Sequence, residues 1–176
     1  MSLPKTKCVF LDRDGVLNED CPDYLYNLDE LIIPDGVPEA LRALKKAGFL
    51  LVVITNQAGI AKGLYTAENV FAIHEAMQQV SGNALDDLYF SPYHPSVSGV
   101  SLSRKPGSLM LEKAIAKYNI DIEQSWMIGD RDRDMEAGKT AGVRTIQIVP
   151  ENEPSTGDFA AVSLIEAAKI ILDRKI

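Results

Sequence analysis

The chain has 176 residues, of which 46% are hydrophobic and 24% are charged, as is typical of one globular domain, 1–176, with a core of ordinary size. Its formal charge of −7 at pH 7 repels polyanions, so we expect no DNA or RNA partner. No signal peptide or run of about 18 apolar residues appears, and the two cysteines are too few for a disulfide framework. These features predict a cytoplasmic protein that does not bind membranes.

Short runs rich in β-branched and apolar residues alternate along the chain with segments whose apolar residues recur at helical spacing. Strands are expected at 8–11, 50–54, 88–90, 126–128 and 145–149. The helical segments that alternate with them are marked by Val37, Leu41 and Leu44; by Val70, Ile73, Met77 and Val80; by Leu111, Ile115 and Tyr118; by 135–141; and by Leu164, Ala168 and Ile171. This alternation predicts an α/β fold, a three-layer Rossmann-like core whose parallel sheet has helices on both faces.

Four residues mark where these helices begin or end. Pro38 suits the first turn of a helix, and Thr66 is expected to be the N-cap of the next one. Gly48 and Gly142 directly follow helical segments and are expected to end them.

The most informative residues are two carboxylates that follow the first expected strand. Asp12 and Asp14 lie two positions apart there, and Gly129-Asp130 with Asp134 follows a later strand. Carboxylates that are packed together repel one another unless they hold a divalent cation. A cation that also binds a transferred phosphoryl group would explain the cluster, so phosphoryl transfer is the leading hypothesis.

Ligands of open parallel sheets bind at the carboxyl ends of the strands, so the loops at that edge are expected to carry the chemistry. Four of these loops carry suitable groups: carboxylates in 12–18, a hydroxyl in 55–63, a lysine in 104–106 and carboxylates again in 129–134. Taken singly, each has an ordinary explanation as a turn, a cap, a solvated lysine or a charged helix start. Their joint occurrence predicts one active site.

These four loops resemble those of the haloacid dehalogenase (HAD) superfamily, in which Asp-x-Asp, Thr or Ser, Lys, and Gly-Asp with a further Asp follow one another in this order. The resemblance covers almost the whole chain and implies a phosphatase, a hydrolase that works through an aspartyl-phosphate. It implies that Asp12 is the nucleophile and that Asp14 is the acid and then the base. Thr55 would hydrogen-bond the phosphoryl oxygens, and Lys105 would offset their charge.

The same resemblance implies a metal site for Mg²⁺, because hard oxygen ligands suit this ion. Its ligands would be Asp12, the backbone carbonyl of Asp14, and Asp130. Asp134 would orient Lys105 or a metal-bound water. The acid at position 14 favours a phosphatase, because dehalogenases lack an acid there and transport ATPases carry Thr.

The spacing of the loops predicts a site without a large cap domain. The expected helix at 37–47 fills much of the segment between Asp14 and Thr55, and a helix and a strand fill much of the segment between Thr55 and Lys105. We therefore expect an open site shaped by loops, in a monomer or a weak homo-oligomer.

A closer resemblance is to the D-glycero-D-manno-heptose 1,7-bisphosphate 7-phosphatases and the related histidinol-phosphate phosphatases. It rests on Phe-Leu-Asp-Arg-Asp-Gly at 10–15, Thr-Asn-Gln-Ala-Gly-Ile-Ala-Lys-Gly at 55–63 and Arg-Lys-Pro at 104–106. It implies a role in carbohydrate metabolism, with a small phosphorylated sugar as the substrate. The substrate-binding residues that it implies are Arg13, Asp20, Asp23, Tyr24, Asn56, Gln57, Ala58, Arg104 and Arg131.

One departure from this family concerns zinc. Members that hold zinc carry Cys-x-His and then Cys-x-Cys, where this chain has Ser91-Pro92-Tyr93 and Ser101-Leu102-Ser103. Serine does not replace thiolate at a structural zinc, so no zinc is expected. This loop borders the expected pocket, so the change bears on the substrate more than on the chemistry.

Three hypotheses remain open at this stage. The first is a heptose bisphosphate 7-phosphatase, and the second is a phosphatase of histidinol phosphate or another small metabolite. The third is a catalytically silent phosphate-binding module, which the intact set of acidic, hydroxyl and lysine residues disfavours. A phosphatase of nucleic-acid 3′ ends is a further possibility that the net negative charge opposes.

Overall fold

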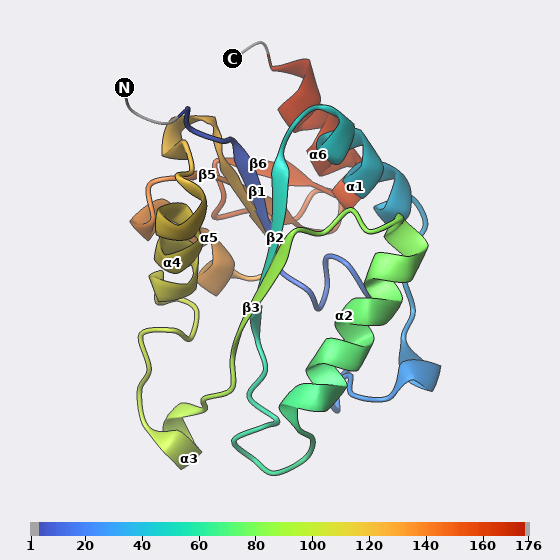
Figure 1. Ribbon diagram of the computed structural model, residues 1–176, viewed down its shortest axis with the longest axis vertical. Helices are drawn as coiled ribbons and strands as arrows, with labels where there is room; N and C mark the ends of the chain where they lie inside the picture. Colours follow the sequence, from blue (N-terminus) through green and yellow to red (C-terminus); the bar gives the residue numbers. More distant parts are fainter. Residues whose placement is uncertain (1–3, 175–176) are drawn as a thin grey trace.

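Six parallel strands form one sheet in the order β3-β2-β1-β4-β5-β6 in the computed structural model, which describes residues 4–174 (Figure 1). The strands are β1 (Cys8–Leu11), β2 (Leu50–Asn56), β3 (Asp87–Ser91), β4 (Trp126–Gly129), β5 (Arg144–Ile148) and β6 (Phe159–Ala161). The helices are α1 (Val37–Lys46), α2 (Ala67–Ser81), α3 (Pro95–Ser98), α4 (Leu109–Tyr118), α5 (Asp132–Thr140) and α6 (Leu164–Asp173), with 3-10 turns η1 (Leu28–Glu30) and η2 (Ile122–Gln124). The predicted α/β architecture is confirmed.

The sheet separates two hydrophobic cores. Helices α1, α2 and α6 cover one face, and α4 and α5 cover the other (Figure 1). Side chains alternate between faces along a strand, and β1 follows this rule. Val9 and Leu11 pack with the first group of helices, whereas Cys8 and Phe10 pack with the second. Both faces of β1 are buried, which explains why its sequence is continuously apolar.

The expected helix ends are confirmed, with one shift. Thr66 is the N-cap of α2, where its backbone N–H donates to the Asn69 side chain at 3.0 Å. Gly48 and Gly142 follow α1 and α5 with φ of +86° and +83°, a conformation that favours glycine. Helix α5 begins at Asp132, earlier than the expected 135, because its first turn is built from charged residues that carry no apolar stripe.

Three details of the sequence interpretation were wrong or incomplete. Val80 is 48% exposed, because the buried stripe of α2 continues from Met77 to Ser81, four residues on, and not to Val80. Strand β6 lies at the sheet edge and has only three residues, too few to show alternation. Helix α3 has four residues, none of them buried, and so leaves no apolar pattern to read.

The order of the strands brings the predicted loops together at one edge. Strand β1 lies between β2 and β4, with Phe10 paired to Val52 on one side and to Met127 on the other. The loops after these three parallel strands therefore lie at the same edge of the sheet. The segment 12–36 contains only η1, consistent with the expected absence of a large cap between β1 and α1. Across residues 4–174, no helix has the length and apolar character needed to cross a bilayer.

The Ser125 hydroxyl holds the start of β1, and replacing this residue tests that role. It is fully buried, accepts from the Cys8 N–H at 2.9 Å and donates to the Asp121 carbonyl at 2.6 Å. Ser125→Ala leaves that N–H without a partner, so the free energy of unfolding should fall by about 1–3 kcal/mol in denaturant titrations. The exposed Ser98→Ala should change it by no more than about 0.5 kcal/mol; equal effects would contradict this account.

Candidate active site

The centre of the site is the ammonium group of Lys105, which is fully buried between two carboxylates. Its Nζ lies 2.8 Å from Asp12 Oδ1 and 2.7 Å from Asp134 Oδ1, and it donates to the Ile54 carbonyl at 2.7 Å. Three oxygen atoms therefore lie within 2.8 Å of this ammonium nitrogen. Asp12 comes from the end of β1, and Asp134 from the first turn of α5.

This arrangement shifts the pKa of the groups in it. Burial raises the pKa of Asp12 to about 8, and the charge of Asp134 adds to this shift while Lys105 opposes it. Burial lowers the pKa of Lys105, but the charges of Asp12 and Asp134 outweigh it and leave that pKa above its ordinary value. One ammonium thus faces two carboxylates, and the excess negative charge favours a proton or a further cation.

Asp130 completes an acidic cluster in which ligand atoms of Asp12, Asp130 and Asp134 lie within 4.8 Å of one another. One oxygen of Asp130, Oδ2, is 2.8 Å from Arg131 Nε. The other, Oδ1, is buried without a hydrogen-bond partner among residues 4–174, which is costly unless an ion binds there. Burial and the charge of Asp134 raise the pKa of Asp130. A set of carboxylate oxygens with one oxygen unpaired fits a hard divalent cation such as Mg²⁺.

Two glycines allow these carboxylates to approach the backbone. A Cβ at Gly129 would lie 2.2 Å from Asp134 Cβ, and a Cβ at Gly15 would lie 2.6 Å from Asp130 Oδ2. Gly15 also has a φ of +81°, a conformation that favours glycine, so both the lack of space and the backbone conformation call for glycine there. Neither position could carry a side chain without displacing an acidic residue.

The carboxylate of Asp14 is held by three neighbouring side chains. Arg13 donates to both of its oxygens, at 2.8 Å to Oδ1 and 3.1 Å to Oδ2. Asn18 donates to Oδ1 at 3.1 Å, and Gln57 donates to Oδ2 at 3.1 Å. Asp14 is only partly buried and lines a pocket of about 330 Å³, so this carboxylate is both fixed and accessible.

The loop after β2 supplies the hydroxyl group and positions the lysine loop. Thr55 is buried and its Oγ1 accepts from Gln57 Nε2 at 2.9 Å. Asn56 accepts from the Lys105 N–H at 3.0 Å and donates to the Lys105 carbonyl at 3.1 Å. The amide of Asn56 thus clamps the lysine backbone, although Asn56 also lines the pocket.

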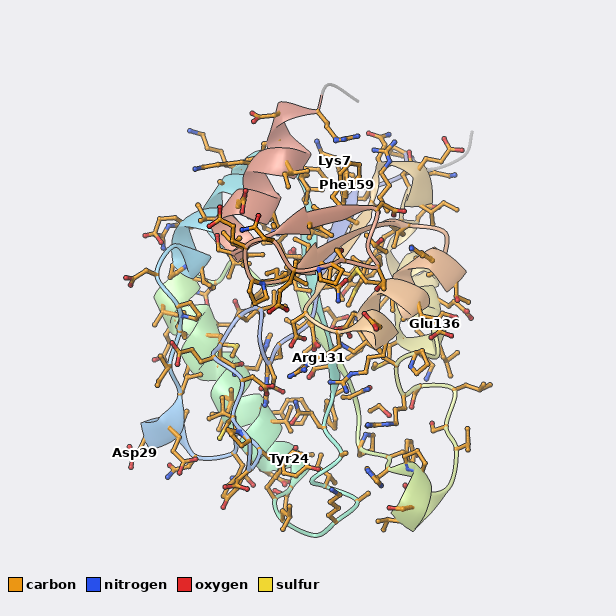
Figure 2. The ribbon with its side chains drawn as sticks, turned by 180° about the vertical axis from the view of Figure 1, so that it is seen from behind. Lys7, Tyr24, Asp29, Arg131, Glu136 and Phe159 are labelled. Atoms are coloured by element: carbon orange, nitrogen blue, oxygen red, sulfur yellow. The ribbon has the colours of Figure 1, made fainter. Side chains whose placement is uncertain are left out.

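The other residues predicted to bind substrate fall into two groups. Those at the pocket are Asp20, Tyr24, Asn56, Arg131 and the buried Arg13; Arg131 bridges Asp20 Oδ2 at 2.7 Å. Gln57 and Ala58 are buried, Asp23 is exposed, and none of the three lines the pocket. Arg104 donates to the Tyr93 carbonyl at 3.2 Å. In Figure 2, Lys7, which directly precedes β1, lies near the top, and Arg131 and Tyr24 lie well below it.

Sequence reasoning missed three residues that the structure places at this site. Arg133 is exposed and lines the pocket, and its charge lowers the pKa of Arg104 together with the larger effect of burial. Asn18 binds Asp14, and Tyr65 binds Gln57. Arg133 and Asn18 belong to the predicted active-site loops 129–134 and 12–18, so only their roles were missed. Tyr65 carried no signal, because it lies outside every motif.

At three positions where zinc-bearing family members carry cysteines, this chain has serines whose hydroxyl groups bind one another. Ser103 Oγ lies 3.1 Å from Ser91 Oγ and 2.9 Å from Ser101 Oγ, and Ser91 is fully buried. The nearby His94 caps α3, where its Nδ1 accepts from the Ser96 N–H at 3.3 Å. The loop is therefore joined at its base by hydrogen bonds between serines.

The close approach at Gly129 makes a testable prediction about the cluster. Gly129→Ala should push Asp134 away from Lys105, lowering the free energy of unfolding by about 1–3 kcal/mol and weakening Mg²⁺ binding in calorimetric titration. Gly82→Ala serves as the control, because it adds backbone strain at a φ of +72° but has no atom within 4 Å and lies at the end of α2. Equal Mg²⁺ affinity in the two variants would contradict the role assigned to Gly129.

Comparisons with known proteins agree with this geometry. The HAD-hydrolase-like family model matches residues 102–158. The D-glycero-beta-D-manno-heptose-1,7-bisphosphate 7-phosphatase of Yersinia pestis is 39% identical over 88% of this chain and 86% of its own length. The corresponding alpha enzyme of Burkholderia mallei is 33% identical over 96% of this chain and 93% of its own length.

A solved structure is similar over nearly its full length. The D,D-heptose 1.7-bisphosphate phosphatase of B. bronchiseptica, complexed with magnesium and phosphate, has a TM-score of 0.85 and 27% identity, covering 95% of this chain and 98% of that one. On the strength of these relatives and of the fold, the chain belongs to the HAD phosphatases, in the family of the D-glycero-D-manno-heptose-1,7-bisphosphate 7-phosphatases.

Proposed function

We propose that the protein is a Mg²⁺-dependent phosphatase that removes the 7-phosphate of D-glycero-D-manno-heptose 1,7-bisphosphate through an aspartyl-phosphate. The observation that carries the proposal is the meeting of Asp12, Lys105 and Asp134 beside Asp14 and Thr55 at one edge of the sheet. The names of the relatives support the substrate. The intact cluster argues against a silent phosphate-binding module.

The first half of the reaction transfers the phosphoryl group to Asp12. A carboxylate oxygen of Asp12 attacks phosphorus in line, and the bond from phosphorus to the sugar oxygen breaks. The proton of the Asp14 carboxyl group passes to that oxygen, which leaves as an alcohol. Thr55 would donate a hydrogen bond to the phosphoryl oxygens, and the Lys105 charge would offset theirs.

The second half returns the enzyme to its starting state. Asp14, now a carboxylate, accepts a proton from a water molecule as the water oxygen attacks phosphorus. The bond from phosphorus to the Asp12 oxygen breaks and inorganic phosphate leaves. Asp12 is again a carboxylate, and Asp14 again carries a proton.

The metal is assigned to Asp12, the Asp14 backbone carbonyl and Asp130, with Asp134 holding Lys105. The unpaired Oδ1 of Asp130 supports this assignment. When bound, Mg²⁺ neutralises charge on the phosphoryl oxygens. No zinc is expected to be needed, because serines occupy the positions of the thiolates.

The remaining features of the proposal concern the setting of the reaction. The pocket of about 330 Å³, bordered by Arg131, Arg133 and Asp20, would receive the sugar. We propose a single domain that acts in the cytoplasm as a monomer or weak homo-oligomer, without nucleic-acid or membrane partners. Both cysteines are free thiols, which is compatible with a reducing compartment.

Replacing the nucleophile tests the mechanism. Asp12→Asn should lower kcat by at least about a thousandfold while leaving the folded structure intact, because an amide oxygen does not form the aspartyl-phosphate. Phosphate release and circular dichroism measure the two effects. A variant that keeps the full rate would refute the covalent mechanism.

Metal removal and pH test the assigned cation site. EDTA should stop turnover and Mg²⁺ should restore it.

The raised pKa of Asp12 makes a second prediction. Without metal, at a pH between the unfolded and the folded pKa of Asp12, this carboxyl keeps its proton in the folded protein but not in the unfolded chain. Its contribution to stability is therefore complete below the unfolded pKa and is lost as the pH rises toward about 8. Mg²⁺ binding must displace this proton, so the rise in Tm caused by Mg²⁺ should be larger at about pH 9 than at about pH 6. An equal rise at both values would contradict the assignment.

A substrate screen tests the proposed specificity. Phosphate release should be compared, as kcat/KM, over both anomers of heptose 1,7-bisphosphate, histidinol phosphate, other sugar phosphates, nucleotides and a 3′-phosphorylated oligonucleotide. Both anomers are needed because relatives at 39% and 33% identity carry the names of opposite anomers. We expect a heptose bisphosphate to be preferred. Preference for histidinol phosphate would contradict the proposed substrate and would mean that the altered serine loop has changed the specificity.

A further inference from the structure

We propose that Tyr65 is a positioning residue for proton transfer, which it controls by orienting Gln57 toward Asp14. This inference rests on the proposed phosphatase function, with Asp14 as the acid. Tyr65 Oη donates to Gln57 Oε1 at 2.7 Å. Gln57 Nε2 in turn donates to Asp14 Oδ2 at 3.1 Å and to Thr55 Oγ1 at 2.9 Å.

The Tyr65 hydroxyl gives Gln57 Oε1 a donor and so stabilises the amide orientation in which the N–H groups face the reacting groups. Gln57 is 1% exposed, so bulk water does not replace its partners. A rotated amide would place its oxygen against the Asp14 carboxylate, where two acceptors repel each other. With Tyr65 donating to Oε1, the amide presents its N–H groups to Asp14 and Thr55.

The surroundings of Tyr65 keep its hydroxyl in place as a donor. The ring is buried, stacks on Tyr26 with centroids 5.6 Å apart, and lies against Gly59, where an added Cβ would be 2.1 Å from a ring carbon. Burial raises the pKa of Tyr65 to about 12, so the hydroxyl keeps its proton at neutral pH. Gly59, which belongs to the loop motif at 55–63, thus makes room for a residue outside that motif.

The orientation matters most when Asp14 gives its proton to the leaving oxygen. The resulting carboxylate accepts hydrogen bonds from Arg13, Asn18 and Gln57, and these bonds favour the transfer. Loss of one donor should slow the departure of a sugar alkoxide, which needs the proton. It should have little effect on a nitrophenolate, which leaves without one. An effect exerted only through Thr55 would act on the phosphoryl group and slow both substrates equally.

The experiment compares kcat/KM for a sugar phosphate and for p-nitrophenyl phosphate, because kcat/KM includes the step in which the leaving group departs. Tyr65→Phe keeps the ring and removes the hydroxyl. We expect a loss of roughly tenfold or more with the sugar phosphate and less than about threefold with the aryl phosphate. The control is Tyr26→Phe, which changes a ring that is 41% exposed and should leave both values unchanged.

Equal losses on the two substrates, or none on either, would overturn the proposal. If Tyr65→Phe does not fold, Gln57→Leu provides the same test, because it removes the donor to Asp14 and keeps a side chain of similar size. The loss of kcat/KM should again be larger with the sugar phosphate than with the aryl phosphate. A wild-type protein that releases no phosphate from any substrate refutes the proposed function, whereas an active wild type with unbiased variants refutes the role of Tyr65 alone.

Discussion

The structure of the site depends on one interaction, the contact of the buried Lys105 ammonium with Asp12 and Asp134. A charge that is removed from water is costly unless it is paired, and Lys105 is paired with two carboxylates and also donates to the Ile54 carbonyl. The interaction draws together three segments that are far apart in sequence: the end of β1, the lysine loop and the start of α5. The geometry that phosphoryl transfer requires is thus tied to the packing of the sheet and its helices.

The neighbouring features either make this contact possible or respond to it. Gly129 lets Asp134 approach, and Asn56 fixes the backbone of the lysine. The contact leaves an excess of negative charge, which appears as the raised pKa of Asp12 and the unpaired oxygen of Asp130. A divalent cation would satisfy both, so the proposed metal requirement originates in the charges gathered around Lys105.

Much of the fold and the chemical centre could be predicted from the sequence, for a physical reason. Strand β1 is buried on both faces and so has a continuously apolar sequence, and parallel strands bring their loops to one edge. That rule, together with the resemblance to HAD phosphatases, singled out Asp12, Lys105 and Asp130. Elements without an apolar pattern, such as β6 and α3, could not be recognised.

The supporting side chains were harder to predict, because burial of polar groups leaves no periodic signal. Arg13 and Gln57 belong to recognisable motifs and were expected to touch substrate. The structure buries both, and they hold Asp14. Tyr65 lies outside the motifs altogether, and only the three-dimensional contact with Gln57 reveals it.

The central claim, that Asp12 takes the phosphoryl group before water does, is tested most directly by the stereochemistry at phosphorus. A thiophosphate ester made chiral with oxygen isotopes would be hydrolysed, and the configuration of the released thiophosphate determined. Two successive in-line displacements, first by Asp12 and then by water, predict retention of configuration. Inversion would mean that water attacks the substrate directly, and it would contradict the account.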